Sequence, residues 1–123
     1  MIKMIKIDTD NIEESKDIPF DIKRIYYIYK TSPNIERGFH AHKNLKQVLH
    51  CVNGSCDIVI DGGRGQNTIT LDNKEDGLLI EGLVWREMKN FSLDCVLVVY
   101  ADNYYNEDDY IRDYTDFINL VKS

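Results

Sequence analysis

The residues best suited to chemistry are two histidines, His40 and His42, in the stretch Glu36–Lys43. Alternate residues of a β-strand point to the same side, so both imidazoles face one way if this stretch is a strand. A neutral imidazole, with an ordinary pKa of about 6.5, can both accept and return a proton near neutral pH. The pair therefore indicates acid–base chemistry or, with further ligands, metal binding.

Gln47 and Gly54 follow the histidine pair at the spacing of the first cupin motif, in which two histidines and a glutamate bind a metal. Here Gln47 stands at the glutamate position, and Arg86 stands where a second motif supplies a third histidine. An amide is a poor replacement for a carboxylate as a metal ligand, and a guanidinium stays protonated. We therefore expect no metal and no other cofactor. Arg86 instead offers a fixed cation that suits an anionic or enolate-like species.

A second group of polar residues, Arg24 and Tyr26, shares one face of the strand-like stretch Lys23–Lys30. The other face is apolar and aromatic. If Arg24 and Tyr26 point inward, they line a pocket and need a ligand or a partner, whereas outward they are ordinary surface residues. The residues alone leave both orientations open. The third histidine, His50, is expected to be structural.

Composition places the chain among ordinary soluble domains and excludes several function classes. Its 123 residues are 43% hydrophobic and 29% charged, which is enough for one modest core without disulfides. A net charge of −6 argues against a general nucleic-acid binder. The chain has no long apolar run and no secretory signal pattern, so neither a membrane span nor export is expected. Three cysteines, an odd number, indicate reduced thiols in the cytoplasm.

The elements that must hold these residues are short strands. Runs of β-branched and aromatic residues are broken by turn signals about every 8–12 residues, which is typical of an all-β sandwich or barrel. The N-terminal residues 1–8 alternate like a strand. Asn53-Gly54 is expected to be a tight hairpin turn that pairs the strands on either side of it, and Gly62–Gly65 is expected to be a second hairpin turn.

The C-terminal part of the chain has a different pattern. Acidic residues at Glu107–Asp109 are followed by apolar residues at helical spacing, which predicts an amphipathic helix over about 107–121. The acidic run is interpreted as the start of that helix rather than as a site. The expected layout is one domain, 1–123, with a barrel over about 1–104 and the helix on its outside.

Three stretches carry a resemblance to a known family, namely Arg37-Gly38-Phe39-His40-Ala41-His42-Lys43 with the later Gln47, then Val84-Trp85-Arg86-Glu87, then Glu107-Asp108-Asp109-Tyr110-Ile111-Arg112-Asp113-Tyr114. With these stretches the chain resembles the sugar 3,4-ketoisomerases of the FdtA/QdtA type, which are grouped with WxcM-like proteins. The resemblance runs from about Ile18 to the C-terminus. It implies a cupin double-stranded β-helix, or jelly-roll barrel, with one C-terminal α-helix.

The resemblance also implies an activity and partners. Enzymes of this family act on dTDP-4-keto-6-deoxy-D-glucose without a metal and move its ketone from C4 to C3. Their product leads to 3-amino-3,6-dideoxy sugars of surface glycans such as O-antigens and S-layer glycans. They form homodimers in which the N-terminal strand is exchanged between subunits. By this resemblance His40 would be the main acid–base residue, and His42 would be its neighbour in the site.

The resemblance favours an inward orientation for Arg24 and Tyr26. Together with them it assigns to the substrate pocket Arg37, Gln47 and Arg86. The family divides by the configuration of the product at C4, and arginine at the position of Arg86 resembles the members that give the ribo product. Lys6, the other residue near this choice, matches neither pattern, so the ribo product is an expectation from Arg86 alone.

Elementary sugar chemistry agrees with this activity. The proton on C3 of a 4-keto sugar is acidic, so a base can remove it to give an enediol, and a proton then returns at C4. Cationic or hydroxyl donors stabilise the developing oxyanion, and a diphosphate-bearing substrate explains arginines inside an acidic protein. Three alternatives stay open: an epimerase of the dTDP-sugar 3,5-epimerase type, for which the chain is short, a non-catalytic sugar-binding or regulatory cupin, and a metal-dependent dioxygenase-like cupin.

Overall fold

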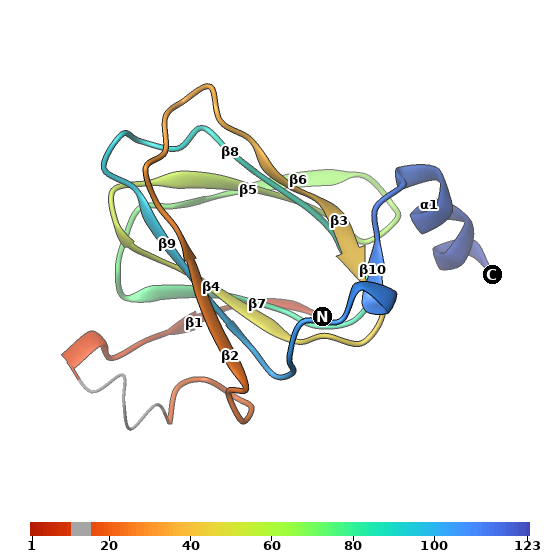
Figure 1. Cartoon of the computed structure of the whole chain (residues 1–123), viewed down its shortest axis with the longest axis horizontal. Coiled ribbons are helices and arrows are strands. Elements are labelled where there is room, and N and C mark those ends of the chain that lie inside the picture. The colour runs from red at the N-terminus through yellow and green to blue at the C-terminus, as the bar shows by residue number, and fades with distance from the viewer. Residues whose placement is uncertain (11–15) are drawn as a thin grey trace.

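Two five-stranded antiparallel sheets face each other across the core (Figure 1). The computed structural model describes residues 1–10 and 16–123. The first sheet has the order β1 (Ile2–Lys6), β7 (Asp76–Ile80), β4 (Gln47–Asn53), β9 (Val96–Ala101) and β2 (Arg24–Ile28). The second has the order β10 (Tyr110–Ile111), β3 (Arg37–His42), β8 (Trp85–Lys89), β5 (Cys56–Asp61) and β6 (Gln66–Leu71). The predicted all-β jelly-roll fold with one C-terminal helix is confirmed.

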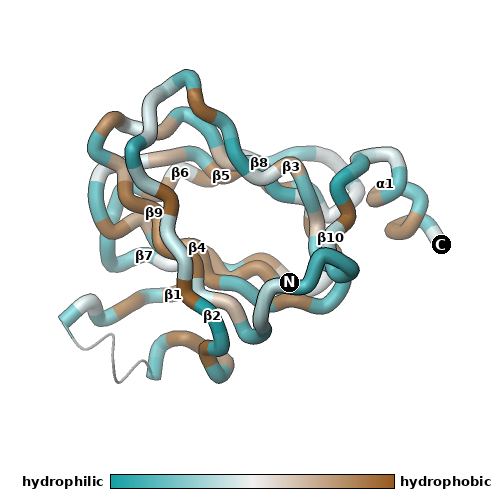
Figure 2. Tube along the Cα trace, viewed as in Figure 1, coloured by the Kyte–Doolittle hydropathy of each residue, from teal (hydrophilic) through white to brown (hydrophobic). Residues whose placement is uncertain are grey.

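Apolar side chains from both sheets meet between them, because alternate residues of each strand point inward. One cluster of buried residues is formed by Leu49, Cys51, Cys56, Ile58, Ile60, Leu71, Leu78, Ile80, Val84, Met88, Phe91, Cys95, Leu97 and Val99. Figure 2 shows hydrophobic residues distributed along the strands of both sheets. The three cysteines are free thiols within this cluster, where they pack as small apolar side chains.

The C-terminal helix α1 (Tyr114–Lys122) begins at Tyr114, so the prediction of a helix from about 107 is wrong at its start. The residues Glu107–Asp109 form a single 3-10 turn, and the next two residues form β10, which pairs with β3. The carboxylate of Asp113 caps α1 by accepting a hydrogen bond from a backbone N–H in its first turn. The apolar pattern before Asp113 suits a helix by sequence, but pairing with β3 holds these residues as a strand.

Contacts made by Phe117 and Tyr114 help to hold α1 against the outside of the barrel (Figure 1). Phe117 packs against Trp85 of β8, with ring centroids 5.9 Å apart. The hydroxyl of Tyr114 donates a hydrogen bond of 2.5 Å to the fully buried carboxylate of Asp61, which also accepts from the backbone N–H of Gly63. These contacts anchor the C-terminal segment, and with it β10, to the second sheet.

The Asn53-Gly54 turn joins the two sheets instead of two paired strands. β4 pairs with β7 and β9 in the first sheet, whereas β5 pairs with β6 and β8 in the second, so the predicted hairpin is wrong. Gly54 has a φ of +69°, and a Cβ there would lie 2.9 Å from the Cα of Cys95. The close packing of this turn on the loop before β9 therefore requires glycine. The second expected turn, Gly62–Gly65, does close a hairpin, because β5 pairs with β6.

The two outer strands of the first sheet expose apolar residues. β1 pairs with β7 of its own chain, and its burial pattern is mostly exposed. Exposed large apolar or aromatic residues on or beside β1 and β2 are Met1, Ile2, Met4, Ile25, Tyr27 and Tyr29. Within residues 1–10 and 16–123, no helix has the length and apolar character needed to cross a membrane.

Candidate active site

A bulge in β3 aims the histidine pair into the barrel. Gly38 and Phe39 have positive φ angles of +89° and +58°, and the pairing of β3 with β8 shifts register between Gly38 and His40. A Cβ at Gly38 would lie 2.9 Å from the backbone oxygen of Arg86, so glycine permits this close approach of the strands. His40 and His42 are buried, at 8% and 0% exposure, and their rings are in contact, which confirms that they share one side.

The two imidazoles pack edge to face, with ring centroids 4.8 Å apart. The ring of Tyr110 on β10 lies 4.9 Å from that of His40 and 4.4 Å from that of His42. Neither ring nitrogen of His40, nor Nε2 of His42, makes a hydrogen bond of good geometry with the residues that the structure describes, although the nearby backbone of Gly38 acts to raise the pKa of His40. Because buried polar atoms are nearly always paired, these three nitrogens are open positions for a ligand or a proton.

Asp109 holds the other nitrogen of His42. Its Oδ2 lies 3.0 Å from His42 Nδ1, and its Oδ1 accepts a hydrogen bond of 2.9 Å from the backbone N–H of Asn44. The backbone N–H of Lys43 donates to the backbone oxygen of Asp109 at 3.0 Å. The sequence analysis interpreted Asp109 as part of a helix start and did not predict its place in the site. The reason is that the pairing of β10 with β3, which brings Asp109 to the histidines, joins segments far apart in the chain.

Arg86 is fully buried opposite His40 in the pairing of β8 with β3. Its Nη1 donates a hydrogen bond of 2.6 Å to Gln47 Oε1, and its Nη2 donates one of 2.9 Å to the backbone oxygen of Val84. Its Nε has no partner in the described part of the chain. Burial lowers the pKa of Arg86 to about 10, so the guanidinium is still protonated at neutral pH.

Arg24 and Tyr26 extend this polar group from the first sheet. Gln47 Nε2 donates a long hydrogen bond of 3.4 Å to the hydroxyl of Tyr26, and the Arg24 guanidinium lies over the Tyr26 ring, 4.5 Å from its centroid. Their neighbours Ile25 and Tyr27 are exposed, so the inward orientation is confirmed. Burial raises the pKa of Tyr26, which keeps its hydroxyl as a neutral donor.

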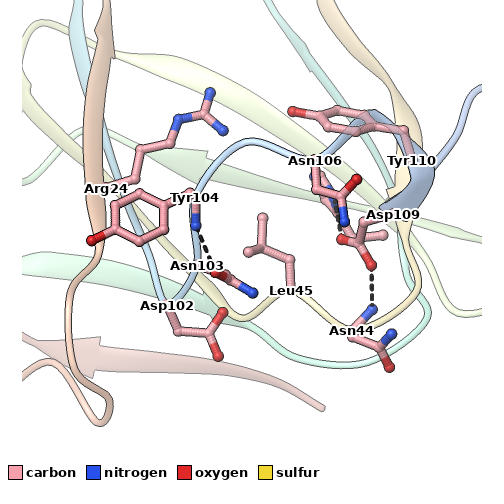
Figure 3. A pocket seen from close by; sticks show the side chains of 10 residues that line it. Arg24, Asn44, Leu45, Asp102, Asn103, Tyr104, Asn106, Asp109 and Tyr110 are labelled. Atoms are coloured by element: carbon pink, nitrogen blue, oxygen red, sulfur yellow. Dashed lines mark hydrogen bonds and ion pairs between the residues drawn. The ribbon is translucent and has the colours of Figure 1, made fainter.

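A cavity of about 150 Å³ opens beside the histidine pair (Figure 3). It is lined by Arg24, His42, Asn44, Leu45, Asp102, Asn103, Tyr104, Asn106, Asp109 and Tyr110. In Figure 3, Arg24 and Tyr104 lie on one side of it, while Asn106, Asp109 and Tyr110 lie on the other. His40, Tyr26, Gln47 and Arg86 are not among the described residues that line it, and the cavity meets the polar group at Arg24 and His42.

Burial first and the positive charge of Arg86 second lower the pKa of His40 to about 4. The same causes, burial first and Arg86 second, lower the pKa of His42 to about 2. Both rings are therefore neutral at neutral pH, and each can accept a proton. A bound anion would raise the proton affinity of both rings, because it offsets the field of Arg86.

The residues at the positions of cupin metal ligands do not fit a metal. Gln47 and Arg86 hydrogen-bond to each other, and the protonated guanidinium places a positive charge beside the two imidazoles. The sulfur atoms of Cys51, Cys56 and Cys95 lie within 4.8 Å of one another, but they belong to the apolar core cluster and not to the histidine site. The site is therefore suited to proton transfer on an anionic species.

Two residues that the resemblance connects with the substrate lie outside this site. Arg37 is exposed at the start of β3 and is not among the described residues that line the cavity. Lys6 forms an exposed ion pair with Asp76, with Nζ 2.5 Å from Oδ1. Within one chain, neither residue contributes to the cavity.

His50 has the structural place that the sequence analysis expected. Its Nδ1 lies 3.1 Å from the hydroxyl of Tyr100, and its Nε2 lies 2.6 Å from the backbone oxygen of Lys74. Both ring nitrogens thus have partners, in contrast to the open nitrogens of the other two histidines.

Known proteins match this chain over nearly its whole length. The FdtA family, described as WxcM-like, C-terminal, matches residues 4–122. A TDP-4-oxo-6-deoxy-alpha-D-glucose-3,4-oxoisomerase of Aneurinibacillus thermoaerophilus is 55% identical over 117 residues, which are 90% of this chain and 84% of that protein. The solved structure of a 3,4-ketoisomerase from Helicobacter canadensis is similar with a TM-score of 0.91 and 45% identity, covering 99% of this chain and 98% of that one.

A second solved structure is that of QdtA, a sugar 3,4-ketoisomerase from Thermoanaerobacterium thermosaccharolyticum in complex with TDP. It is similar with a TM-score of 0.91 and 43% identity, covering 98% of this chain and 94% of that one. The matched residues 4–122 of this chain include the histidine pair and every residue that contacts it.

Proposed function

The chain belongs to the FdtA family of WxcM-like proteins, and we infer that it is a sugar 3,4-ketoisomerase acting on dTDP-4-keto-6-deoxy-D-glucose. The observation that carries this function is the set of three unpartnered imidazole nitrogens beside a buried guanidinium. The 55% identity to a 3,4-oxoisomerase supports it over the epimerase and non-catalytic alternatives. The ketone moves from C4 to C3, and transamination at C3 is the proposed next step.

The reaction requires two proton transfers and no oxidant. The substrate has a ketone at C4 and carries hydrogen on C3 and on O3. The product has a ketone at C3 and carries hydrogen on C4 and on O4. One proton therefore moves from C3 to C4, and another moves from O3 to O4. Two neutral imidazoles in contact can divide these tasks between them.

His40 is the proposed base for the carbon-bound proton. It takes the proton from C3 and leaves an enolate with its charge on O4, then returns the proton to C4. Arg86 and the hydroxyl of Tyr26 are the proposed stabilising groups for the enolate, since a fixed cation and a neutral donor act best where charge develops. The pKa of His40, about 4 without ligand, rises when the substrate's negative charge enters.

His42 is the proposed carrier of the oxygen-bound proton. Its unpartnered Nε2 accepts the proton of the O3 hydroxyl and delivers it to O4. The negative charge then lies on O3, so that C4 can accept the proton held by His40. If this transfer fails, the enolate can only return to the substrate.

Arg24 is the proposed contact for the diphosphate, because it lines the cavity and presents a guanidinium that suits paired phosphate oxygens. The cavity of about 150 Å³ is smaller than the roughly 300–1,000 Å³ of ordinary ligand pockets. We therefore place the sugar in the cavity and the nucleotide along its rim. Arg37, which is exposed and outside the cavity lining, stays a prediction from the family resemblance. Arg86 favours the ribo configuration at C4 of the product.

The enzyme is proposed to be a homodimer with exchange of its N-terminal strands. Exposed apolar residues on β1 and along the outer side of β2 favour coverage by a second copy, since an open, apolar sheet edge promotes association. Exchange would let β1 make the same pairing with β7 of the partner. Sedimentation velocity at micromolar concentration should give one species of twice the chain's mass. A monomer under these conditions contradicts the proposal.

The cytoplasm is its proposed compartment. Its three cysteines are buried as free thiols, which suits a reducing environment.

Carbon-13 NMR tests the activity directly. With dTDP-4-keto-6-deoxyglucose labelled with carbon-13 at C4, the labelled carbon should change from a ketone to a carbinol when the protein is added. The rate should be the same after dialysis against EDTA, because no step passes through a metal. A label that stays a ketone shows that the protein does not catalyse this isomerisation, and a rate restored only by a divalent ion shows that the metal-free mechanism is wrong.

A further inference from the structure

We propose that Asp109 is a positioning residue that fixes His42 in the tautomer with hydrogen on Nδ1, which leaves the lone pair on Nε2. This inference rests on the proposed function, since the tautomer affects the reaction only if His42 carries a proton between sugar oxygens. Asp109 is not assigned to the chemistry by the motifs in the sequence, and its side chain reaches His42 through strand pairing alone.

The hydrogen bonds around Asp109 determine which atom carries the hydrogen. An ionised carboxylate can only accept hydrogen bonds. Oδ1 accepts from the backbone N–H of Asn44 at 2.9 Å, and Oδ2 faces His42 Nδ1 at 3.0 Å. His42 therefore has to be the donor in this contact. The backbone contact between Lys43 and Asp109 holds the carboxylate in place, because it fixes the main chain on which it is carried.

The charge on His42 completes the assignment. Burial and the field of Arg86 keep the ring neutral, so it has one hydrogen to place. With that hydrogen on Nδ1, Nε2 is a pure acceptor. An acceptor at Nε2 is what the O3 hydroxyl needs in order to give up its proton. The opposite tautomer would present a hydrogen to O3 and could not take one.

The variant Asp109→Asn should reverse the tautomer. The amide oxygen of asparagine has to take the place of Oδ1, because the Asn44 N–H needs an acceptor. The amide NH₂ then faces His42 Nδ1 and donates to it. Nδ1 becomes the acceptor, and the hydrogen moves to Nε2. The matched control is Asp108→Asn, which makes the same change of charge at the neighbouring exposed position.

Nitrogen-15 NMR of the histidine rings tests the tautomer without any substrate. In the wild-type protein the His42 signals should show hydrogen on Nδ1 and a bare Nε2, and Asp108→Asn should leave them unchanged. In Asp109→Asn the pattern should be reversed. A wild-type His42 with hydrogen on Nε2 overturns the proposal, and this reading needs no variant that could fail to fold.

Kinetics test the consequence. Asp109→Asn should lower turnover of dTDP-4-keto-6-deoxyglucose by about 10²–10⁴-fold relative to Asp108→Asn, as the equivalent change does in a Ser-His-Asp triad. Exchange of the C3 hydrogen with deuterated water should stay within a few-fold of wild type, because His40 still forms the enolate. Turnover equal to the control overturns the proposal, as does a parallel loss of C3 exchange with unchanged affinity for TDP. A wild-type protein with no turnover at all contradicts the proposed function instead.

Discussion

Arg86 carries a positive charge into the interior and donates its hydrogen bonds to neutral oxygens, on Gln47 and on the backbone of Val84. A buried charge without a bonded counter-ion costs free energy, because water solvates the ion better than the protein does. The proposed reaction explains why the residue is tolerated. A cation held beside two neutral imidazoles is ready for an enolate and does not have to reorganise when the charge develops.

We expect the double variant Arg86→Met with Gln47→Leu to be inactive but at least as stable as wild type, with a free energy of unfolding higher by about 1–4 kcal/mol. Removing both partners takes away the buried charge together with its main acceptor. Arg86→Met alone leaves the Gln47 oxygen unpaired and should be less stable than the double variant by about 1–3 kcal/mol. Urea unfolding measures both. If the double variant is less stable than wild type, the buried pair stabilises the fold, and this explanation is wrong.

At the scale of elements, the site depends on the short C-terminal strand β10. Its pairing with β3 places Asp109 and Tyr110 against the histidines. A strand of two residues has little stability of its own, and α1 follows it directly. The helix is joined to the second sheet by the hydrogen bond from Tyr114 to the buried carboxylate of Asp61. The hydrogen bond between Tyr114 and Asp61 should therefore help to keep β10, and with it Asp109 and Tyr110, in place beside the histidines.

The variant Tyr114→Phe tests this connection. It leaves one oxygen of the buried Asp61 carboxylate without its donor, and we expect the free energy of unfolding to fall by about 1–3 kcal/mol. Tyr104→Phe is the matched control, because Tyr104 is exposed on the loop after β9, away from the proposed dimer surface, and should change stability by less than about 0.5 kcal/mol. Chemical denaturation followed by circular dichroism compares them. Equal stability of the two variants would show that the hydroxyl does not anchor the helix.

Most strands could be predicted from the sequence because their signals are local. Alternation and β-branched runs found the strands that carry the histidine pair, Gln47 and Arg86, and the motif spacing linked them. The start of the last helix and the partner strands across Asn53-Gly54 could not be found in this way. Both depend on which sheet each segment joins, and that is decided by packing of residues far apart in the chain. Asp109 was missed for the same reason.

At the scale of the whole molecule, the site lies where the two sheets meet. The second sheet provides the histidine pair and Arg86, while the first provides Gln47 and Tyr26. The two sheets enclose polar groups that only an intact barrel keeps from water. Folding and site formation are therefore coupled, and the buried neutral histidines make that coupling depend on pH.

Stability should fall as the pH drops below about 6.5. In the unfolded chain a histidine binds a proton at about that pH, whereas burial lowers the pKa of His40 to about 4 in the folded protein. The stability that the neutral His40 ring contributes is fully present above about pH 6.5 and is lost as the pH falls toward 4. For His42 the loss of stability continues toward about pH 2. For each of the two rings, the free energy of unfolding should fall by about 2 kcal/mol between pH 7 and pH 5.

Urea unfolding at these two pH values measures the loss. In His40→Asn the difference between pH 7 and pH 5 should be smaller than in wild type by about 2 kcal/mol. A variant with the full wild-type pH dependence would show that His40 is not buried as a neutral ring.

The most direct test of the central claim, proton transfer by His40 in a 3,4-ketoisomerase, is proton NMR of dTDP-4-keto-6-deoxyglucose with the protein in deuterated water. With wild type, deuterium should enter at C3 of the substrate and at C4 of the 3-keto product, and C5 should keep its hydrogen. With His40→Asn, entry at C3 and C4 should fall by at least about 10²-fold, while TDP still binds within a few-fold. Deuterium at C5, or entry at C3 at the wild-type rate in His40→Asn, would contradict the assignment.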